Sequence, residues 1–447
     1  MRTVTVQLPY ADHTMSLTLP QANLLAVASP ATFPVPDPEK EVCRALQEPI
    51  GMGRFSSLVQ RGTQVVIVVD DITRPTPAYR VLPPLLEELK VGDLELRVQI
   101  LLALATHRPM TESEVATKIG AEVAARYQWV QHDSTDHRQM VSLGRTLNGT
   151  PIEVNRMIVD ADVTIGIGNI MAHPLAGWGG GGKIIQPGVC SERTTDATHL
   201  LSGQVPVSAL GKVDGNVVRL EMEEVARRAG LTGIVNTVLD GNGAIMRVVA
   251  GDMVAAHRAG VEAARSIWQV EVPALADIVV VSSHPSDIDY WQALRGILCA
   301  ENVVKRGGEI ILVTPSPERI TTNPAHLQTL TMLTGVPSRE ILVFARRHGL
   351  TDFNAVGSAM LTGRVNETAF VTVVSDGMTP DDCAILGHDY AATLDEAMAR
   401  AFARQGSEAM VTVLTHGGAS YAVVSGRTSK GSDTMSGASQ GPASRRN

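Results

Sequence analysis

The sequence predicts an α/β protein with two α/β domains, in which mainly parallel sheets are flanked by helices. Three observations support this fold class. Short runs of Val, Ile and Leu alternate with helical patterns, as expected for parallel strands that are buried on both faces. Only 4% of the residues are aromatic, so the cores must be aliphatic. With 447 residues, the chain is long enough for two or more domains.

The first domain is expected over residues 1–272. Its start, residues 1–20, alternates between apolar and polar side chains like a hairpin. Hairpin turns are also expected at Asn148 and Gly149 and at residues 241–243. The apolar runs that predict strands are residues 64–69, 98–105 and 163–168, and the patterns that predict helices are residues 112–127, 217–229 and 253–270.

The second domain is expected over residues 273–425, after a hinge near Pro273. Its last elements are free to pack back on the first domain. Residues 426–447 are rich in Gly and Ser and have almost nothing to bury, which predicts a disordered tail. The predicted strands of this domain are residues 278–281, 309–314, 341–345 and 369–375.

The composition argues against several classes of function. The net charge is −8 and no basic stripe is present, so nucleic acid is not an expected partner. No run of about 18 apolar residues is present, so no membrane span is expected. The cysteines, Cys43, Cys190, Cys299 and Cys383, are widely spaced, which indicates a reducing compartment. We expect a cytoplasmic protein, and the sequence leaves its oligomeric state open.

The segment from His173 to Lys183, HPLAGWGGGGK, is unusually rich in glycine. Consecutive glycines favour a loop that is built for close approach, and such a loop suggests a bound cofactor or substrate. Gly177 to Lys183 also fits the phosphate-binding pattern G-x-x-x-x-G-K. That loop requires Ser or Thr where Ile184 stands, which disfavours a nucleotide hydrolase. A flexible surface linker with a solvated lysine is the simpler alternative.

Polar clusters follow three of the predicted strands. Asp71 and Arg74 follow the first strand, His107 the second and His173 the third. Since ligands of open α/β sheets bind at the carboxyl ends of the strands, the three clusters should converge on one crevice. Taken alone, each cluster has a local explanation, such as a turn at Asp71 or a capping box from Thr111 and Glu114 beside His107.

Together these motifs resemble the nickel-pincer lactate racemase family. The resemblance rests on segments in the family's order and spacing, spread over more than half of the chain: DDITRPTP at 70–77, ATHRPMTESE at 105–114, HPLAGWGGGGK at 173–183, His199, and YWQALRG at 290–296. It identifies the active site with the cleft between the two domains.

The resemblance implies a covalent cofactor, pyridinium-3-thioamide-5-thiocarboxylic acid mononucleotide, which holds nickel. In the family the lysine after the glycines carries this cofactor, which corresponds to Lys183, and a following histidine binds the metal, which corresponds to His199. Asp71, Thr73 and the glycines are expected in the cofactor site. Separate cofactor-synthesis proteins are the implied partners. The glycines concerned are Gly179, Gly180, Gly181 and Gly182.

The resemblance further implies a racemase or epimerase that inverts C2 of a 2-hydroxy acid. Proton-coupled hydride transfer would pass through a flat 2-keto acid. His107 and His173 correspond to the acid and base of the family, one for each enantiomer, and imidazole exchanges protons near neutral pH. Arg74 is the natural clamp for the substrate carboxylate because guanidinium binds carboxylates in a bidentate manner. Asp71 would orient a histidine or steady the cationic ring.

The chain departs from the family on the expected substrate side. Trp291 stands where the best-known members have tyrosine, and Arg295 where they have lysine, while Gln292 matches. A further substrate-side tryptophan of the family is replaced near Phe353. Arginine can hold a second carboxylate or a polyol. We therefore expect a small-molecule substrate that is larger or more polar than lactate.

Two other classes of function remain open from the residues alone. One is a zinc-dependent hydrolase or lyase that uses His107, His173 and His199 with Asp71. It lacks a local H-x-x-x-H ligand pair and leaves Lys183 unexplained. The other is a non-enzymatic binder of a hydroxy acid or a mononucleotide, for which two candidate bases would be superfluous.

Overall fold

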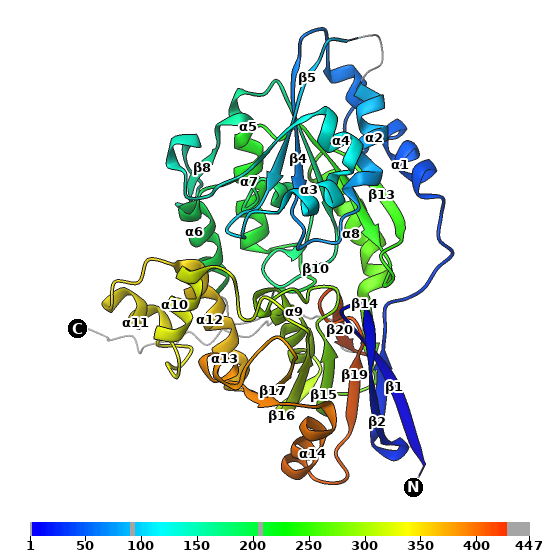
Figure 1. Cartoon of the computed structure of the whole chain (residues 1–447), viewed down its shortest axis with the longest axis vertical. Coiled ribbons are helices and arrows are strands. Elements are labelled where there is room, and N and C mark those ends of the chain that lie inside the picture. Colours follow the sequence, from blue (N-terminus) through cyan, green and yellow to red (C-terminus); the bar gives the residue numbers. More distant parts are fainter. Residues whose placement is uncertain (1, 90–93, 204–208, 427–447) are drawn as a thin grey trace, which may run out of the picture.

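The structure is a computed structural model that describes residues 2–89, 94–203 and 209–426. From residue 427 on, the predicted disordered tail lies outside the described residues. The chain forms two α/β units, each built on a six-stranded sheet, and they lie one above the other in Figure 1. The predicted fold class of mainly parallel sheets flanked by helices is confirmed.

The first sheet is parallel except for its edge strand β13, which pairs antiparallel with β12. Both of its faces are covered. In β4, Val65, Ile67 and Val69 pack in a cluster with α1 and α2, whereas Val66 and Val68 belong to the cluster of α7 and α8. Burial on both faces explains why this strand is a continuous apolar run. The strand order is β13 (Ile245–Gly251), β12 (Gly233–Leu239), β9 (Val163–Asn169), β4 (Gln64–Asp70), β5 (Arg97–Ala103) and β6 (Gln128–Gln131), and the helices are α1 (Pro38–Gln47), α2 (Ala78–Leu89), α7 (Val217–Ala229) and α8 (Ala255–Trp268).

Smaller elements complete the first unit. The predicted helix over 112–127 is interrupted at Gly120, whose φ of +89° is not helical, and the capping box of Thr111 and Glu114 is confirmed. The hairpin expected at Asn148 and Gly149 is confirmed between β7 and β8. These elements are α3 (Glu112–Ile119), α4 (Ala121–Arg126), β7 (Met140–Arg145), β8 (Pro151–Asn155), α5 (Arg156–Asp160), β10 (Ala172–His173), β11 (Gly177–Trp178) and α6 (Glu192–Gly203).

All neighbouring strands of the second sheet are parallel. The hairpin of β1 and β2 and helix α14 cover one face, and α9 and α12 pack on the other. The strand order is β18 (Asp389–Ala391), β17 (Phe370–Val374), β16 (Val304–Val313), β15 (Ala276–Ser282), β19 (Val411–Leu414) and β3 (Leu24–Ala28). The other elements are β1 (Thr3–Tyr10), β2 (His13–Pro20), α9 (Tyr290–Glu301), α10 (Pro324–Met332), α11 (Ile341–Arg347), α12 (Phe353–Asn366), α13 (Pro380–Ile385) and α14 (Leu394–Gln405).

The start of the chain lies with the second sheet, unlike the expectation of a first domain over residues 1–272. Strand β3 forms the edge of the second sheet beside β19, and Figure 1 shows β1 and β2 next to these strands. At the junction, β14 (Gln269–Val272) pairs with the last strand, β20 (Tyr421–Val424). We propose a first unit of residues 29–272 and a second unit of residues 2–28 and 273–425.

The predicted strand over 341–345 is wrong, because these residues form helix α11. Ile341 and Ala345, four positions apart, are buried, whereas Val343 is 68% exposed. This is the burial pattern of a short amphipathic helix, and a five-residue apolar run does not distinguish it from a strand.

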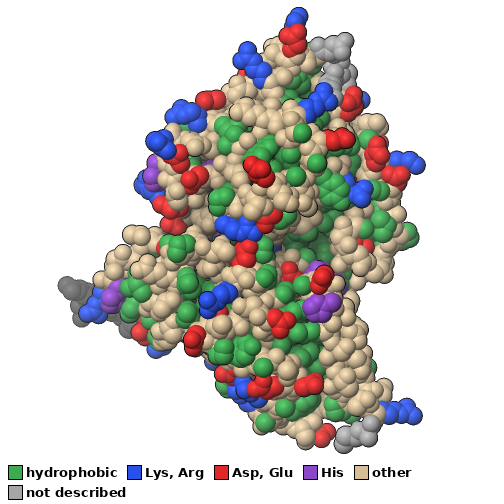
Figure 2. All heavy atoms as spheres, viewed as in Figure 1, with side chains coloured by type: hydrophobic (Ala, Val, Ile, Leu, Met, Phe, Trp, Pro, Cys, Tyr) green, Lys and Arg blue, Asp and Glu red, His purple; other side chains and the backbone are tan. Residues whose placement is uncertain are grey.

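No helix within the described ranges is both long and apolar enough to cross a membrane. On the face shown in Figure 2, acidic and basic side chains are intermixed. That distribution agrees with the net charge of −8 and differs from the basic stripe of a nucleic-acid-binding surface.

Candidate active site

A cavity of about 120 Å³ lies between the two units. The first unit contributes the residues that follow β4, β5 and β9, and the second unit contributes α9 and α12. The three predicted strand-end clusters therefore converge, as expected for the carboxyl ends of parallel strands. Of the predicted site residues, those that line this cavity are Asp71, Arg74, His107, His173, Lys183, His199, Trp291, Gln292 and Arg295.

His107 is held by Asp71 through its Nδ1 atom. The distance from Nδ1 to Asp71 Oδ2 is 2.5 Å, and the backbone N–H and hydroxyl of Thr73 donate to Oδ1 of the same carboxylate. Burial alone would raise the pKa of Asp71, but the charge and hydrogen bond of His107, together with Arg74, bring it below its ordinary value. An ionised Asp71 therefore accepts the Nδ1 proton, which leaves the lone pair of His107 on Nε2.

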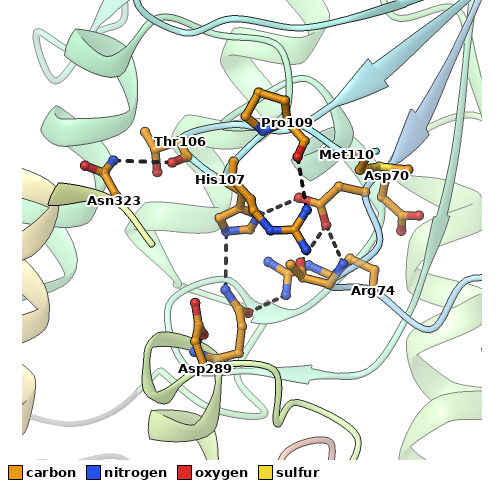
Figure 3. A network of polar contacts seen from close by, with 12 residues as sticks. Asp70, Arg74, Thr106, His107, Pro109, Met110, Asp289 and Asn323 are labelled. Atoms are coloured by element: carbon orange, nitrogen blue, oxygen red, sulfur yellow. Dashed lines mark hydrogen bonds and ion pairs between the residues drawn. The ribbon is translucent and has the colours of Figure 1, made fainter. Parts of the chain in front are cut away.

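Gln292, from the first turn of α9, supports this tautomer. Its amide Nε2 lies 3.3 Å from His107 Nε2, and its Oε1 accepts a hydrogen bond of 2.6 Å from Arg74 Nη1. Figure 3 shows His107 and Arg74 in the polar network to which these two contacts belong. Because one amide contacts both residues, α9 of the second unit connects the candidate base with the candidate carboxylate clamp of the first unit.

His173 has the opposite arrangement. Its Nδ1 accepts hydrogen bonds of 3.2 Å from the backbone N–H groups of Leu175 and Ala176, within the turn between β10 and β11. A neutral ring must then carry its proton on Nε2. Burial first, and then the charges of Lys183 and Arg295, lower the pKa of His173 well below its ordinary value. His173 is thus a neutral hydrogen-bond donor at the cavity.

Lys183 directs its amine into the same cavity. Burial, followed by the charges of Arg74 and Arg295, lowers its pKa well below the ordinary value of lysine. Within the parts of the chain that the structure describes, no group accepts a hydrogen bond from its Nζ. A lowered pKa makes the unprotonated, nucleophilic form of a lysine amine more accessible, and such an amine is suited to form a covalent bond to a ligand.

The glycines before Lys183 do not line the cavity and pack against the protein itself. Their expected contact with a cofactor stays a prediction. Gly180 and Gly181 have φ of +72° and +63°. A Cβ at Gly180 would lie 2.6 Å from Asn236 Oδ1, and one at Gly182 would lie 3.0 Å from Ala226 Cβ of α7. The close approach that the glycines permit is therefore to β12 and α7.

Arg219 and His257 hold the carbonyl groups of this glycine loop, and neither was predicted from the sequence. The guanidinium of Arg219, buried on α7, donates to the carbonyls of Ala176, Trp178 and Gly180. His257 of α8 lies 2.8 Å from the Gly179 carbonyl. A sequence signal existed for Arg219, because it falls on the apolar face of α7 with Met222 and Ala226.

His199 lies on α6 with its Nδ1 2.9 Å from the Thr195 carbonyl. Nδ1 must donate to this acceptor, so the lone pair of the neutral ring is on Nε2. Burial lowers the pKa of His199 to about 4, which keeps the imidazole neutral near pH 7. This is the usual arrangement of a metal-binding histidine. No three His, Cys, Asp or Glu side chains gather to hold a metal anywhere in the described ranges, so the zinc alternative lacks a ligand set.

Trp291 and Arg295 form the wall on the side of the second unit. The indole of Trp291 stacks on the ring of His326, with centroids 4.4 Å apart, and His326 Nδ1 lies 2.7 Å from Asp352 Oδ2. Arg295 is only 5% exposed, and its nearest polar contact is Ser286 Oγ, 3.4 Å from Nη1.

Phe353 and Thr73 do not line this cavity, and their expected roles in binding stay predictions. Phe353 packs in the small apolar cluster around α11, and Asn354 of the same helix faces the cavity instead. The residue directly after a helix N-cap and its neighbour face different sides of the helix. A shift of one residue in the alignment with the family therefore changes which side chain is expected at the cavity. Thr73 contacts the site through its hydrogen bonds to Asp71.

The fold and the cavity define a two-unit α/β protein with a histidine-lined cavity between its units. Family models for the lactate racemase N-terminal domain and C-terminal domain match residues 10–211 and 272–423. A lactate racemase from Lactiplantibacillus plantarum is 32% identical over 93% of this chain and 98% of its own length. A second, from Thermoanaerobacterium thermosaccharolyticum, is 31% identical over 69% of this chain and 73% of its own.

Solved structures agree with these matches. The lactate racemase apoprotein from Thermoanaerobacterium thermosaccharolyticum has a TM-score of 0.85 at 26% identity and covers 94% of this chain and 100% of its own. The chain therefore belongs to the lactate racemase family. It is an isomerase of the racemase type.

Proposed function

We propose that this racemase inverts C2 of a 2-hydroxy acid that is larger or more polar than lactate. The proposed cofactor is a nickel-pincer nucleotide joined to Lys183, with His199 as a nickel ligand. The observation that carries this proposal is that His107, His173, Lys183 and Arg74 line one cavity. The chemistry that the group supplies when bound is reversible acceptance of a hydride from the substrate carbon.

The residues present fit such a group. Lys183 offers an amine with a lowered pKa, to which the described part of the chain provides no acceptor. His199 offers a neutral imidazole whose Nδ1 proton is held by the Thr195 carbonyl. A single imidazole suits a metal that takes its remaining ligands from a pincer.

The side chains of the chain bind the substrate and move its hydroxyl proton. Arg74 binds the substrate carboxylate, and Gln292 orients Arg74 through the 2.6 Å hydrogen bond. His107 accepts the hydroxyl proton at Nε2, and ionised Asp71 stabilises the imidazolium that results. His173 serves the opposite face of the 2-keto acid, where its Nε2–H donates a hydrogen bond to the carbonyl oxygen. The ring takes up a second proton before it returns one to that oxygen, so that it is neutral again once the alcohol has re-formed.

The proposal includes the setting of the enzyme. We place it in the cytoplasm, where its cysteines, free among the described residues, stay reduced, and we expect separate proteins to supply the cofactor. Its oligomeric state is left open.

A panel of single-enantiomer 2-hydroxy acids tests the proposal. The chain is produced together with cofactor-synthesis proteins, and both enantiomers of each product are quantified by chiral chromatography. Intact mass should show a covalent adduct in the wild type and in Lys40→Ala, an exposed-lysine control. Lys183→Ala should lose both the adduct and activity. Racemisation at the wild-type rate by Lys183→Ala would contradict the proposal.

A further inference from the structure

Arg295 is a buried cation without a carboxylate partner. It lines the cavity and is 5% exposed, and no carboxylate of a described residue lies at ion-pair distance from its guanidinium. Its contacts are Ser286 Oγ at 3.4 Å and Met171 Sδ at 4.0 Å. The Ser286 hydroxyl donates to the Gly418 carbonyl, so its oxygen can only accept from Arg295. Most of the five N–H donors of this guanidinium are therefore available to a ligand.

The carboxylates that line the cavity are engaged elsewhere. Asp70 pairs with Lys118 at 2.8 Å and accepts from the Thr76 hydroxyl. Asp71 is bound to His107 and Thr73. Neither forms an ion pair with Arg295, although the charge of Asp71 acts on the pKa of Arg295 in the raising direction.

Arg74 is a second cation of the same cavity, and it contacts the neutral amide of Gln292. Burial, followed by the charge of Arg74, lowers the pKa of Arg295 well below its ordinary value, so the two cations destabilise each other. A buried charge is costly unless it is paired, and a ligand anion can provide the missing pair. A ligand with two anionic groups can pair with both guanidinium groups.

We propose that Arg295 and Ser286 form a second oxyanion subsite, separate from Arg74, and that it binds a second carboxylate of the substrate. The inference rests on the proposed function, and it names the substrate class as 2-hydroxy dicarboxylic acids. Arg74 binds the C1 carboxylate next to His107, and Arg295 binds the distal one. The charged guanidinium of Arg295 favours a carboxylate over the hydroxyls of a polyol, because charge-assisted hydrogen bonds are the stronger ones.

A phosphate group presents the same oxyanion chemistry, and a nucleotide cofactor carries one. The experiment therefore measures binding to the full chain produced without cofactor-synthesis proteins. Calorimetric titrations compare malate, which is a four-carbon 2-hydroxy dicarboxylate, with lactate and with inorganic phosphate. The variants are Arg295→Met and, as a control for the loss of a distant arginine, Arg44→Met on α1, whose partners are Glu41 and Glu48.

We expect malate to bind the wild type and Arg44→Met about tenfold to a hundredfold more tightly than lactate, the range of one charge-assisted contact. Arg295→Met should abolish this preference. If phosphate binding depends on Arg295 and malate binds no better than lactate, the subsite serves a phosphate and the dicarboxylate class is overturned. If no ligand responds to Arg295→Met, the subsite itself is overturned.

Thermal unfolding in the absence of ligand provides a second measurement. Removal of an unpaired buried charge should leave the Tm of Arg295→Met equal to or above that of the wild type, whereas loss of a structural arginine would lower it. Turnover by the cofactor-loaded chain separates the two proposals. If no 2-hydroxy acid is racemised, the proposed function fails while the binding result stands. Equal losses of malate and lactate turnover in Arg295→Met overturn only the subsite.

Discussion

The two histidines of the cavity are held through their Nδ1 atoms in opposite ways. His107 donates from Nδ1 to Asp71, and His173 accepts at Nδ1 from two backbone N–H groups. In the ligand-free chain, His107 therefore presents a lone pair at Nε2 that can take a proton, and His173 presents an Nε2–H that can hydrogen-bond a carbonyl oxygen. A racemase needs both functions, because the two enantiomers present their hydroxyl groups in different directions.

Single-turnover experiments test this division of work. With single-enantiomer substrate and acid quench, His107→Ala and His173→Ala should each form enzyme-bound 2-keto acid from one enantiomer only. Each should lose steady-state racemisation by a factor of at least about 100, since positioned acid/base groups contribute that much. In the wild type, the enantiomer that faces His107 should react faster in the first turnover. Equal amounts of keto acid from both enantiomers in either variant would refute the division.

The depressed pKa of Lys183 has a consequence in the chain without cofactor. An amine with a lowered pKa loses its proton at a lower pH, so modification by cyanate should have its pH midpoint below that of a surface lysine. Peptide mass spectrometry can follow Lys183 and exposed Lys40 in one sample. Coinciding midpoints would show that the amine is solvated and charged.

Most of the side chains that reach the cavity follow strand ends, and this is why they could be predicted. Asp71, His107 and His173 stand directly after apolar runs, and the parallel topology brings such positions together. Arg219 and His257 could not be assigned a role, because their partners are backbone carbonyls of a distant loop. Every residue has a backbone carbonyl, so the residue types in the sequence do not show which carbonyl a side chain will bind.

Among the elements, the crossing of α6 and α12 fixes the position of the proposed nickel ligand. These helices belong to different units, and they approach closely because glycines lie at the contact. A Cβ at Gly357 of α12 would lie 2.6 Å from the carbonyl oxygen of His199. Short apolar runs are ambiguous between helix and strand, and for this reason the apolar run around Val343 predicts a strand although it forms a helix.

Gly357→Ala should therefore push α6 away from α12. We expect a loss of about 1–3 kcal/mol in the free energy of unfolding, the usual cost of overpacking, and weaker retention of nickel. Gly363→Ala on the same helix is the control, because its Cβ would meet Ser338 Cβ at 3.2 Å. Urea unfolding and metal analysis of the loaded protein give the two numbers. Equal behaviour of both variants would contradict this role of Gly357.

The glycine loop should depend on Arg219 in a comparable way. Arg219 donates from three different nitrogens, whereas the donors of a lysine lie on one nitrogen that does not span the three carbonyls. For Arg219→Lys we therefore expect roughly 2–4 kcal/mol lower stability and less covalent adduct on Lys183. Arg227→Lys, exposed on the same helix, should change neither quantity. Full adduct formation by Arg219→Lys would show that the loop holds Lys183 without this clamp.

For the whole molecule, the sequence predicts two parallel-sheet units and a cleft, because the apolar runs restart after Pro273. It does not predict that residues 3–28 join the second sheet. The alternating pattern of β1 and β2 predicts that one face of the hairpin is buried, but it does not predict which of the two sheets this face packs against. Only the register of β3 with β19 decides that.

Buried histidines outside the cavity should make the fold sensitive to acid. Burial lowers the pKa of His132 and of His388 to about 4, below the value of about 6.5 in an unfolded chain. Their contribution is present above pH 6.5 and is lost as the pH falls toward 4. Each should add about 1.4 kcal/mol per pH unit to the slope of the unfolding free energy. Urea titrations of the wild type and His132→Gln check this, and identical slopes would contradict it.

The pairing of β3 with β19 also sets an order of events during synthesis. Ala28 is synthesised 387 residues before Thr415, whose backbone N–H donates a hydrogen bond to the Ala28 carbonyl. The first unit has all of its strands long before that, so it can fold on the ribosome while β3 waits for its neighbour. Helices α9 and α12 are translated after Lys183. The amine of Lys183 therefore stays uncovered in the nascent chain until the second unit closes over it.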